Sequence, residues 1–162
     1  MKKHILPLIG LLLLALNSIA QKPVKYIKYD KYEGVIFSSP TFIMKEERSK
    51  PLYIPSEMDI AKMEKILSSP FGKSFLLLNN RDPNYDFPCD FVNSLPKYKG
   101  YYFGNWLNNE KIIETFFFIK RPDNTDWKKS YFYIEDGGCD YFRVLYSVKS
   151  NTFSGLCIGA FE

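Results

Sequence analysis

The fold is decided by residues 111–148, which read KIIETFFFIKRPDNTDWKKSYFYIEDGGCDYFRVLYSV. Isoleucine, phenylalanine, tyrosine and valine are concentrated in three runs, 111–119, 130–136 and 141–148, and such residues favour β-strands. A polar connection at 121–127 separates the first two runs, and a tight Gly137-Gly138 turn separates the last two. This pattern predicts three antiparallel strands at the centre of a sheet.

Two further strand candidates, 98–107 and 152–161, flank this stretch, and turns at Asn108-Asn109 and Ser150-Asn151 join them to it. In the last hairpin we expect Lys149 to lie opposite Thr152. That register sets each glycine of the final strand across from a large ring, and it places Cys157 opposite Val144 in the middle of the apolar face.

A single convincing helix is predicted to begin at Ser56, a natural N-cap followed by acidic residues. Ile60, Met63 and Leu67 form its apolar stripe, and Pro70 with Gly72 ends it. Residues 21–48 are predicted to form one or two short strands. Residues 74–78 suit either a short strand or a helical turn, and residues 79–97 are predicted to form a long loop with a short helical turn. The fold class expected is α+β, one main helix packed on a curved antiparallel sheet of four to five strands.

The first 20 residues have the pattern of a signal peptide. Lys2 and Lys3 precede an apolar run, Ile5–Leu16, which is shorter than the ~20 residues of a membrane span. Small residues ending at Ala20 suit cleavage there. We therefore expect an exported protein, periplasmic or extracellular, with residues 21–162 forming one domain and no membrane span in the mature chain.

Removing that segment also removes His4, the single histidine of the chain. Ser-His-Asp and Cys-His catalysis and His-ligated metals are then excluded, and we expect no cofactor. Basic residues fall to 20 against 18 acidic ones, which argues against nucleic acid as a partner. Three cysteines, Cys89, Cys139 and Cys157, leave the existence of an internal disulfide open.

Carboxylates offer two weak candidate sites. Asp136 and Asp140 flank the Gly-Gly turn, where they could hold Ca²⁺, although aspartate and glycine are common in turns without any metal. Glu114 interrupts an apolar strand, and together with Glu135 it could form the carboxylate pair of a glycan hydrolase. We expect Glu114 instead to face solvent.

Aromatic residues, 12 Tyr, 14 Phe and 2 Trp, supply the main functional prediction. Several strands carry rings on both faces, and one helix covers one face. The other face must be covered in one of three ways: by residues 21–54 together with the 79–97 loop, by a second chain, or by a ligand. We predict a non-catalytic domain that binds a protein or a glycan through this face. The predicted binding residues are Tyr101, Phe103, Trp106, Trp127 and Tyr131.

Two resemblances accompany these patterns. The run YKGYYFGN, a lone Trp127 and DGGCDYF resemble small secreted bacterial proteins of unknown function, which implies no activity or site. Their usual Arg-Gln pair is missing here. The order of elements resembles that of cystatins, which implies a secreted inhibitor as an alternative function. The Gln-x-Val-x-Gly hairpin of cystatin inhibitors has no counterpart at Asn108-Asn109.

Overall fold

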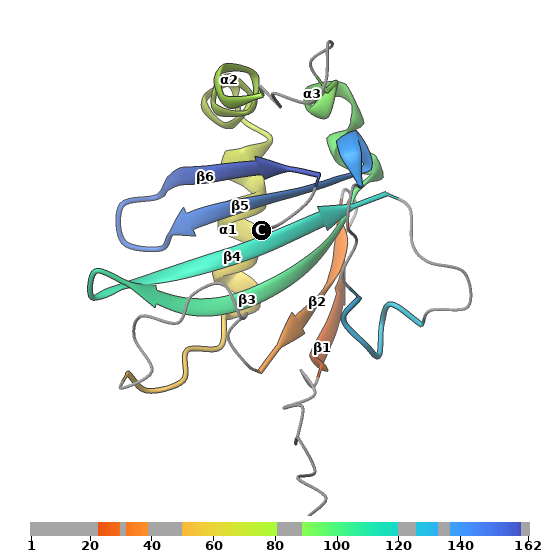
Figure 1. The fold of residues 1–162 in the computed structure, drawn as a ribbon. Coiled ribbons are helices and arrows are strands. Elements are labelled where there is room, and N and C mark those ends of the chain that lie inside the picture. The colour runs from red at the N-terminus through yellow and green to blue at the C-terminus, as the bar shows by residue number, and fades with distance from the viewer. Residues whose placement is uncertain are drawn as a thin grey trace, which may run out of the picture.

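The described residues of the chain form a six-stranded mixed sheet with three α-helices, an α+β architecture (Figure 1). The computed structural model describes residues 23–29, 32–38, 50–80, 89–119, 126–132 and 137–159. The predicted signal peptide lies outside these residues. The fold class is thus confirmed in its coarse form, while the sheet is larger than expected and more than one helix accompanies it.

The six strands lie in the sheet in the same order as in the chain. They are β1 (Pro23–Lys28), β2 (Glu33–Phe37), β3 (Lys99–Leu107), β4 (Glu110–Phe118), β5 (Tyr141–Ser147) and β6 (Thr152–Ile158). All neighbours are antiparallel except β2 and β3, which run parallel. The expected purely antiparallel sheet is therefore wrong at this one pairing, because the helices between β2 and β3 return the chain to the end of the sheet where β2 began.

Helix α1 (Glu57–Leu67) begins where the sequence predicted. The Ser56 hydroxyl accepts a hydrogen bond from the Asp59 backbone N–H at 3.1 Å, and the Asp59 carboxylate accepts one from the Ser56 N–H at 3.2 Å. This reciprocal capping box satisfies two otherwise unpaired donors. The helix lies across one face of the sheet (Figure 1).

Pro70 does not end the helical region; it opens a second helix, α2 (Pro70–Asn79). Proline suits the first helical turn, because its missing N–H would be unpaired there anyway. The 74–78 run is thus helical, and α2 leaves Phe71, Leu77 and Leu78 exposed. The predicted helical turn in the following loop is also present, as α3 (Phe91–Ser94) and a 3₁₀ turn (Leu95–Lys97).

The β3–β4 hairpin turns at Asn108 and Asn109 as expected, and both residues have positive φ, 50° and 64°. The β5–β6 register differs from the prediction: Ser147, not Lys149, lies opposite Thr152. A four-residue turn that ends at Asn151 replaces the predicted two-residue turn. Cys157 consequently lies opposite Arg143 and belongs to the other face.

The predicted strand at 130–136 is wrong over its described part, because residues 130–132 are irregular. Residues 133–136 lie outside the described residues. β5 already pairs with β4 on one edge and with β6 on the other. No edge of β5 is left for a third partner.

Each face of the sheet carries its own core. Under α1, buried residues of the helix meet strand residues such as Tyr102, Ile113 and Phe142. On the opposite face lies a second cluster, which consists of Val35, Phe37, Tyr101, Phe103, Phe116, Phe118, Trp127, Phe132 and Tyr141. Segment 126–132 supplies the cover: Trp127 contacts Phe118 with ring centroids 5.7 Å apart, and Phe132 contacts the same ring at 4.9 Å.

A disulfide joins Cys89 to Cys139 across 50 positions of sequence and ties the segment before α3 to the turn before β5. Tyr98 reinforces this junction by donating a hydrogen bond to the Cys139 carbonyl. Cys157 is half-buried against the second cluster.

Candidate functional site

The predicted aromatic face is largely core. Tyr101 and Phe103 are fully buried and Trp127 is 3% exposed, because segment 126–132 lies over them. The expectation that this face is open to a partner is wrong at these three positions. Tyr131 is half-buried and packs its ring edge against Phe103 at a centroid distance of 5.4 Å.

Trp106 is the fifth predicted binding residue, and it lies apart from the others. Its indole N–H donates to the Pro51 carbonyl at 2.8 Å, and Tyr53 packs against the ring. The ammonium groups of Lys50 and Lys111 lie over the same ring, each 5.9 Å from its centroid. The structure therefore does not bring the five residues together as one surface.

The prediction that Glu114 faces solvent is wrong, because its side chain is fully buried. Its carboxylate accepts hydrogen bonds from Asn105 Nδ2 at 2.8 Å and from Arg143 Nη1 at 3.1 Å. This is a paired buried charge of the kind that protein interiors tolerate. Its proposed partner in hydrolysis, Glu135, lies outside the described residues.

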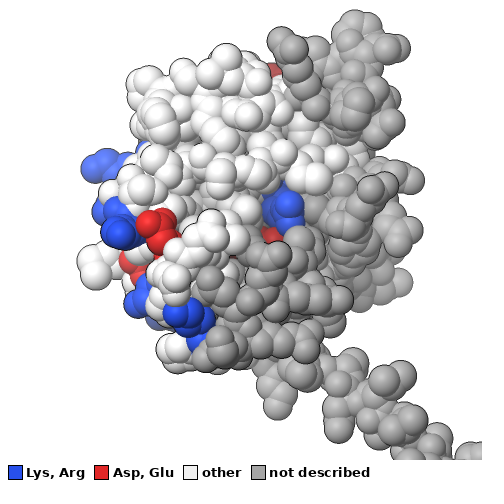
Figure 2. All heavy atoms as spheres, turned by 60° about the vertical axis from the view of Figure 1, so that its left-hand side comes forward, with Lys and Arg blue, Asp and Glu red and all other residues white. Residues whose placement is uncertain are grey.

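The candidate calcium ligand Asp136 also lies outside the described residues, whereas Asp140 ends a 3₁₀ turn, Gly138–Asp140. Within the described part of the chain, no three His, Cys, Asp or Glu side chains are grouped to hold a metal ion. On the described part of the face that Figure 2 shows, basic and acidic side chains lie beside one another rather than in a patch of one sign. A hollow is therefore a better candidate site than a charged patch.

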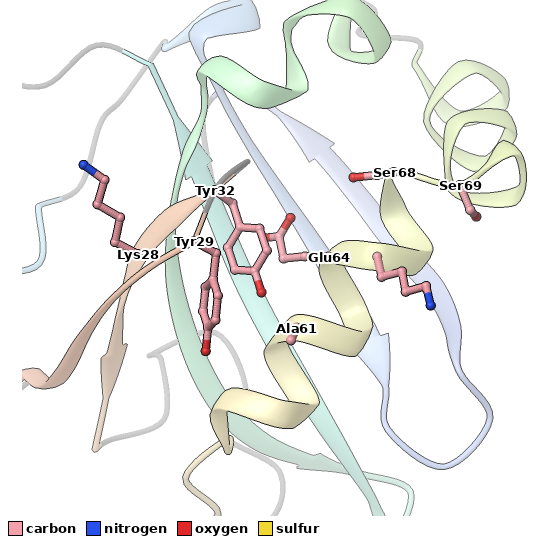
Figure 3. Close-up of a pocket in the computed structure, with 8 residues that line it drawn as sticks. Lys28, Tyr29, Tyr32, Ala61, Glu64, Ser68 and Ser69 are labelled. Atoms are coloured by element: carbon pink, nitrogen blue, oxygen red, sulfur yellow. The ribbon is translucent and has the colours of Figure 1, made fainter.

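Such a hollow opens between α1 and the end of the β1–β2 hairpin (Figure 3), with a volume of about 610 Å³. We call it the tyrosine cleft. Its lining consists of Lys28, Tyr29, Tyr32, Ala61, Glu64, Lys65, Ser68 and Ser69. The volume falls within the ~300–1,000 Å³ that is usual for small-molecule sites.

Two tyrosine rings form one wall of the cleft. Tyr29 and Tyr32 stand side by side and point toward α1 (Figure 3), with ring centroids 4.8 Å apart. The Tyr29 N–H donates to the Tyr32 carbonyl at 2.9 Å, and the Tyr29 hydroxyl donates to Glu57 on α1 at 2.9 Å. These bonds fix the wall relative to the helix. Burial, and then the nearby carboxyl of Glu64, raise the pKa of Tyr32 to about 12.

Glu64 lies at the back of the cleft, where it points from α1 toward the tyrosines (Figure 3) and is 3% exposed. Its Oε1 accepts a hydrogen bond from the Tyr102 hydroxyl at 2.9 Å. Burial raises the pKa of Glu64 from 4.5 to about 7, and the Tyr102 hydrogen bond opposes that rise. A carboxyl of this kind changes its charge near neutral pH.

Two glycines give Tyr102 the space from which it reaches Glu64. Gly34 on β2 and Gly100 on β3 are direct neighbours across the parallel pair. A Cβ on Gly100 would lie 2.5 Å from the Tyr102 hydroxyl oxygen, and one on Gly34 would clash with the same ring and with the Gly100 carbonyl. The tyrosine ring therefore lies over bare backbone, and its hydroxyl extends to the helix.

A smaller hollow of about 260 Å³ shares Lys28, Tyr29 and Tyr32 with the cleft. Its other side includes Glu33, which is bridged to Lys99 and accepts from Tyr26 at 2.6 Å. Burial acts to raise the pKa of Glu33, but the hydrogen bonds from Lys99 and Tyr26 outweigh it and lower the pKa. The two tyrosines thus line both hollows. One hollow contains the carboxyl of Glu64, whose pKa is raised, and the other contains the carboxyl of Glu33, whose pKa is lowered.

Sequence reasoning missed Glu64, Tyr29 and Tyr32, and a signal for Glu64 was available. Ile60, Met63, Glu64 and Leu67 follow the i, i+3, i+4, i+7 spacing of one helix face, and all four are buried. A glutamate at a core position of that stripe indicates a buried polar contact. Nothing in the local sequence indicates that Tyr29 and Tyr32 stand opposite it.

Comparisons of the chain with protein-family models, with curated proteins and with solved structures find no match. Among the described residues, no helix combines the length and the apolar character needed to cross a membrane.

Proposed function

We propose that this chain is an exported, non-catalytic domain that binds a saccharide in the tyrosine cleft. The observation that carries the proposal is the meeting of two fixed tyrosine rings with a carboxyl group and the Ser68 hydroxyl in one hollow. Sugar rings stack on aromatic faces, and their hydroxyls need hydrogen-bonding groups at the edge of that contact. The sequence predicted that a partner binds to the aromatic sheet face, and we now propose that the ligand binds in the cleft instead.

Export is supported by the N-terminal apolar segment and by the Cys89–Cys139 disulfide, because disulfides persist mainly in oxidising compartments. The absence of catalysis is inferred from the described lining of the cleft, in which Glu64 is the one carboxyl, whereas glycoside hydrolysis generally uses two. The alternatives of a cystatin-like inhibitor and of a carboxylate-based hydrolase gain no support from the described residues.

The test is titration of the mature protein with a panel of mono- and disaccharides, followed by calorimetry and by amide chemical shifts. Tyr29→Ala should weaken binding by up to about tenfold, because stacking on one ring contributes about 0.5–1.5 kcal/mol. Tyr29 is 38% exposed, so this variant should fold, and circular dichroism verifies that it does.

The matched control is Trp106→Phe, which alters an aromatic side chain outside the cleft. It should leave saccharide affinity unchanged. If Trp106→Phe weakens binding and Tyr29→Ala does not, the ligand binds elsewhere and the cleft is not the site.

A further inference from the structure

We infer that the tyrosine cleft selects ligands that carry a protonated amine, with Glu64 as the group that receives it. This inference rests on the proposed function, because it names the chemical class of the saccharide: an amino sugar with a free amine. It is carried by the geometry at the back of the cleft rather than by the lining as a whole.

The first observation is the state of the Glu64 carboxyl. Oε1 accepts the hydrogen bond from Tyr102, while Oε2 has no hydrogen-bond donor among the described residues. The side chain is 97% removed from solvent and is directed into the cleft (Figure 3). Oε2 is not one of the fully enclosed polar atoms that lack a partner, so it can be reached from the cleft, and a ligand that places an N–H donor there gains a charge-assisted hydrogen bond.

The second observation is that no cation of the described residues competes for this carboxyl. Lys28, on the β1 side, is exposed and extends away from the cleft (Figure 3), and Lys65, on α1 itself, is exposed. Burial raises the pKa of Glu64 and the hydrogen bond from the Tyr102 hydroxyl lowers it, and no lysine within the described ranges adds to these two effects. The other described residues of the lining are Tyr29, Tyr32, Ala61, Ser68 and Ser69, of which the Ser69 hydroxyl donates to the Ile66 carbonyl at 2.6 Å. A ligand can therefore supply the positive charge that pairs with the Glu64 carboxylate.

The third observation is the tyrosine wall beside this carboxyl. An ammonium group near an aromatic face is attracted by the negative potential of the ring, and more strongly where water is excluded. Tyr29 and Tyr32 place two rings on the side of the cleft that Glu64 faces. A ligand that enters between the rings and the helix can thus meet an anion and π-faces at the same time.

Recognition of an amine by Glu64 makes binding dependent on pH. The carboxyl must be ionised to pair with the ammonium group, and burial together with the Tyr102 hydrogen bond makes it ionise near pH 7. For a cation whose charge is fixed, the affinity should therefore rise about tenfold between pH 6 and pH 8, following the ionised fraction of one group.

The test compares glucosamine with N-acetylglucosamine at pH 7, two ligands with the same ring, of which only the first is cationic. We expect glucosamine to bind the wild-type protein about tenfold more tightly or better, which is the usual worth of a charge-assisted hydrogen bond. Glu64→Gln should remove this preference while leaving the affinity for N-acetylglucosamine nearly unchanged. Tetramethylammonium, a fixed cation, serves as the probe for the pH profile, which should become flat in Glu64→Gln.

The outcomes separate the two ideas. Equal affinity for both sugars, or tighter binding of N-acetylglucosamine, overturns the amine inference and leaves saccharide binding in place. Binding of tetramethylammonium without either sugar supports the role of Glu64 and overturns the saccharide proposal. Failure of all three probes to bind overturns both. A preference for glucosamine that persists in Glu64→Gln assigns amine recognition to another residue and overturns the inference.

Discussion

Replacing Glu64 by Gln should remove a loss of stability that the wild-type protein undergoes as the pH rises from 5 to 8. Burial raises the pKa of Glu64 from 4.5 to about 7 in the folded protein. The folded state therefore holds this proton more tightly than the unfolded chain does. The resulting stabilisation is complete below pH 4.5 and is lost as the pH rises through 7.

The magnitude follows from the two pKa values. Proton linkage with 4.5 in the unfolded chain and about 7 in the folded protein predicts that Glu64 contributes about 2.5 kcal/mol less to the free energy of unfolding at pH 8 than at pH 5. Glutamine preserves the shape and still accepts the hydrogen bond from Tyr102, but it does not titrate. The stability of Glu64→Gln relative to wild type should thus rise by about 2.5 kcal/mol over this range.

The assay is urea denaturation of both proteins at half-unit steps of pH, followed by tyrosine and tryptophan fluorescence. Taking the difference between the two proteins cancels the titration of all other groups. Glu57→Gln, on the same helix, is the control: hydrogen bonds from Lys25 and Tyr29 lower the pKa of Glu57, so its contribution is lost toward acid, the opposite sign. Parallel pH curves for wild type and Glu64→Gln would refute the conclusion that burial raises the pKa of this carboxyl.

Three further changes test other parts of the structure. Gly34→Ala should destabilise the protein by about 2–3 kcal/mol in urea denaturation, because a Cβ there meets the Gly100 carbonyl and the Tyr102 ring; an effect within 0.5 kcal/mol would contradict the packing of that ring over bare backbone. Cys139→Ser should lower the free energy of unfolding by about 4 kcal/mol, because the Cys89–Cys139 bridge spans 50 positions of sequence. The reduced wild type is measured beside it, and equal stability of the oxidised and reduced proteins would contradict this prediction. Arg143→Met should cost about 3 kcal/mol by leaving the fully buried Glu114 carboxylate with one partner fewer, and Lys149→Met, at an exposed ion pair, is its control with little effect.

The cleft illustrates how much of a site local sequence can predict. Glu64 could have been found, because its spacing from Ile60 and Leu67 places it on the buried face of α1. Its partners could not. Tyr102 reaches it from 38 positions further along the chain, and Tyr32 stands opposite it because of how the β1–β2 hairpin sits beside the helix. The positions of Tyr102 and Tyr32 beside Glu64 depend on packing between segments far apart in the chain, which a local sequence pattern cannot predict.

By itself, the sequence determined the elements whose stability is local. Ser56 and Asp59 set the start of α1 through hydrogen bonds within four residues, and Asn108-Asn109 set the β3–β4 turn through backbone conformations that asparagine tolerates. Aromatic and β-branched runs located β3, β4, β5 and β6, because such side chains favour strands wherever they pack.

Only the tertiary structure decided the rest. The parallel β2–β3 pairing, the 126–132 cover over the second face and the Cys89–Cys139 bridge all join segments far apart in the chain. Segment 130–132 has the aromatic residues of a strand, but the strands near it are already paired on both sides. Its rings pack instead over the second apolar cluster and bury it. The burial of that face moved the candidate site from the sheet to the cleft beside α1, which two tyrosines and one glutamate line.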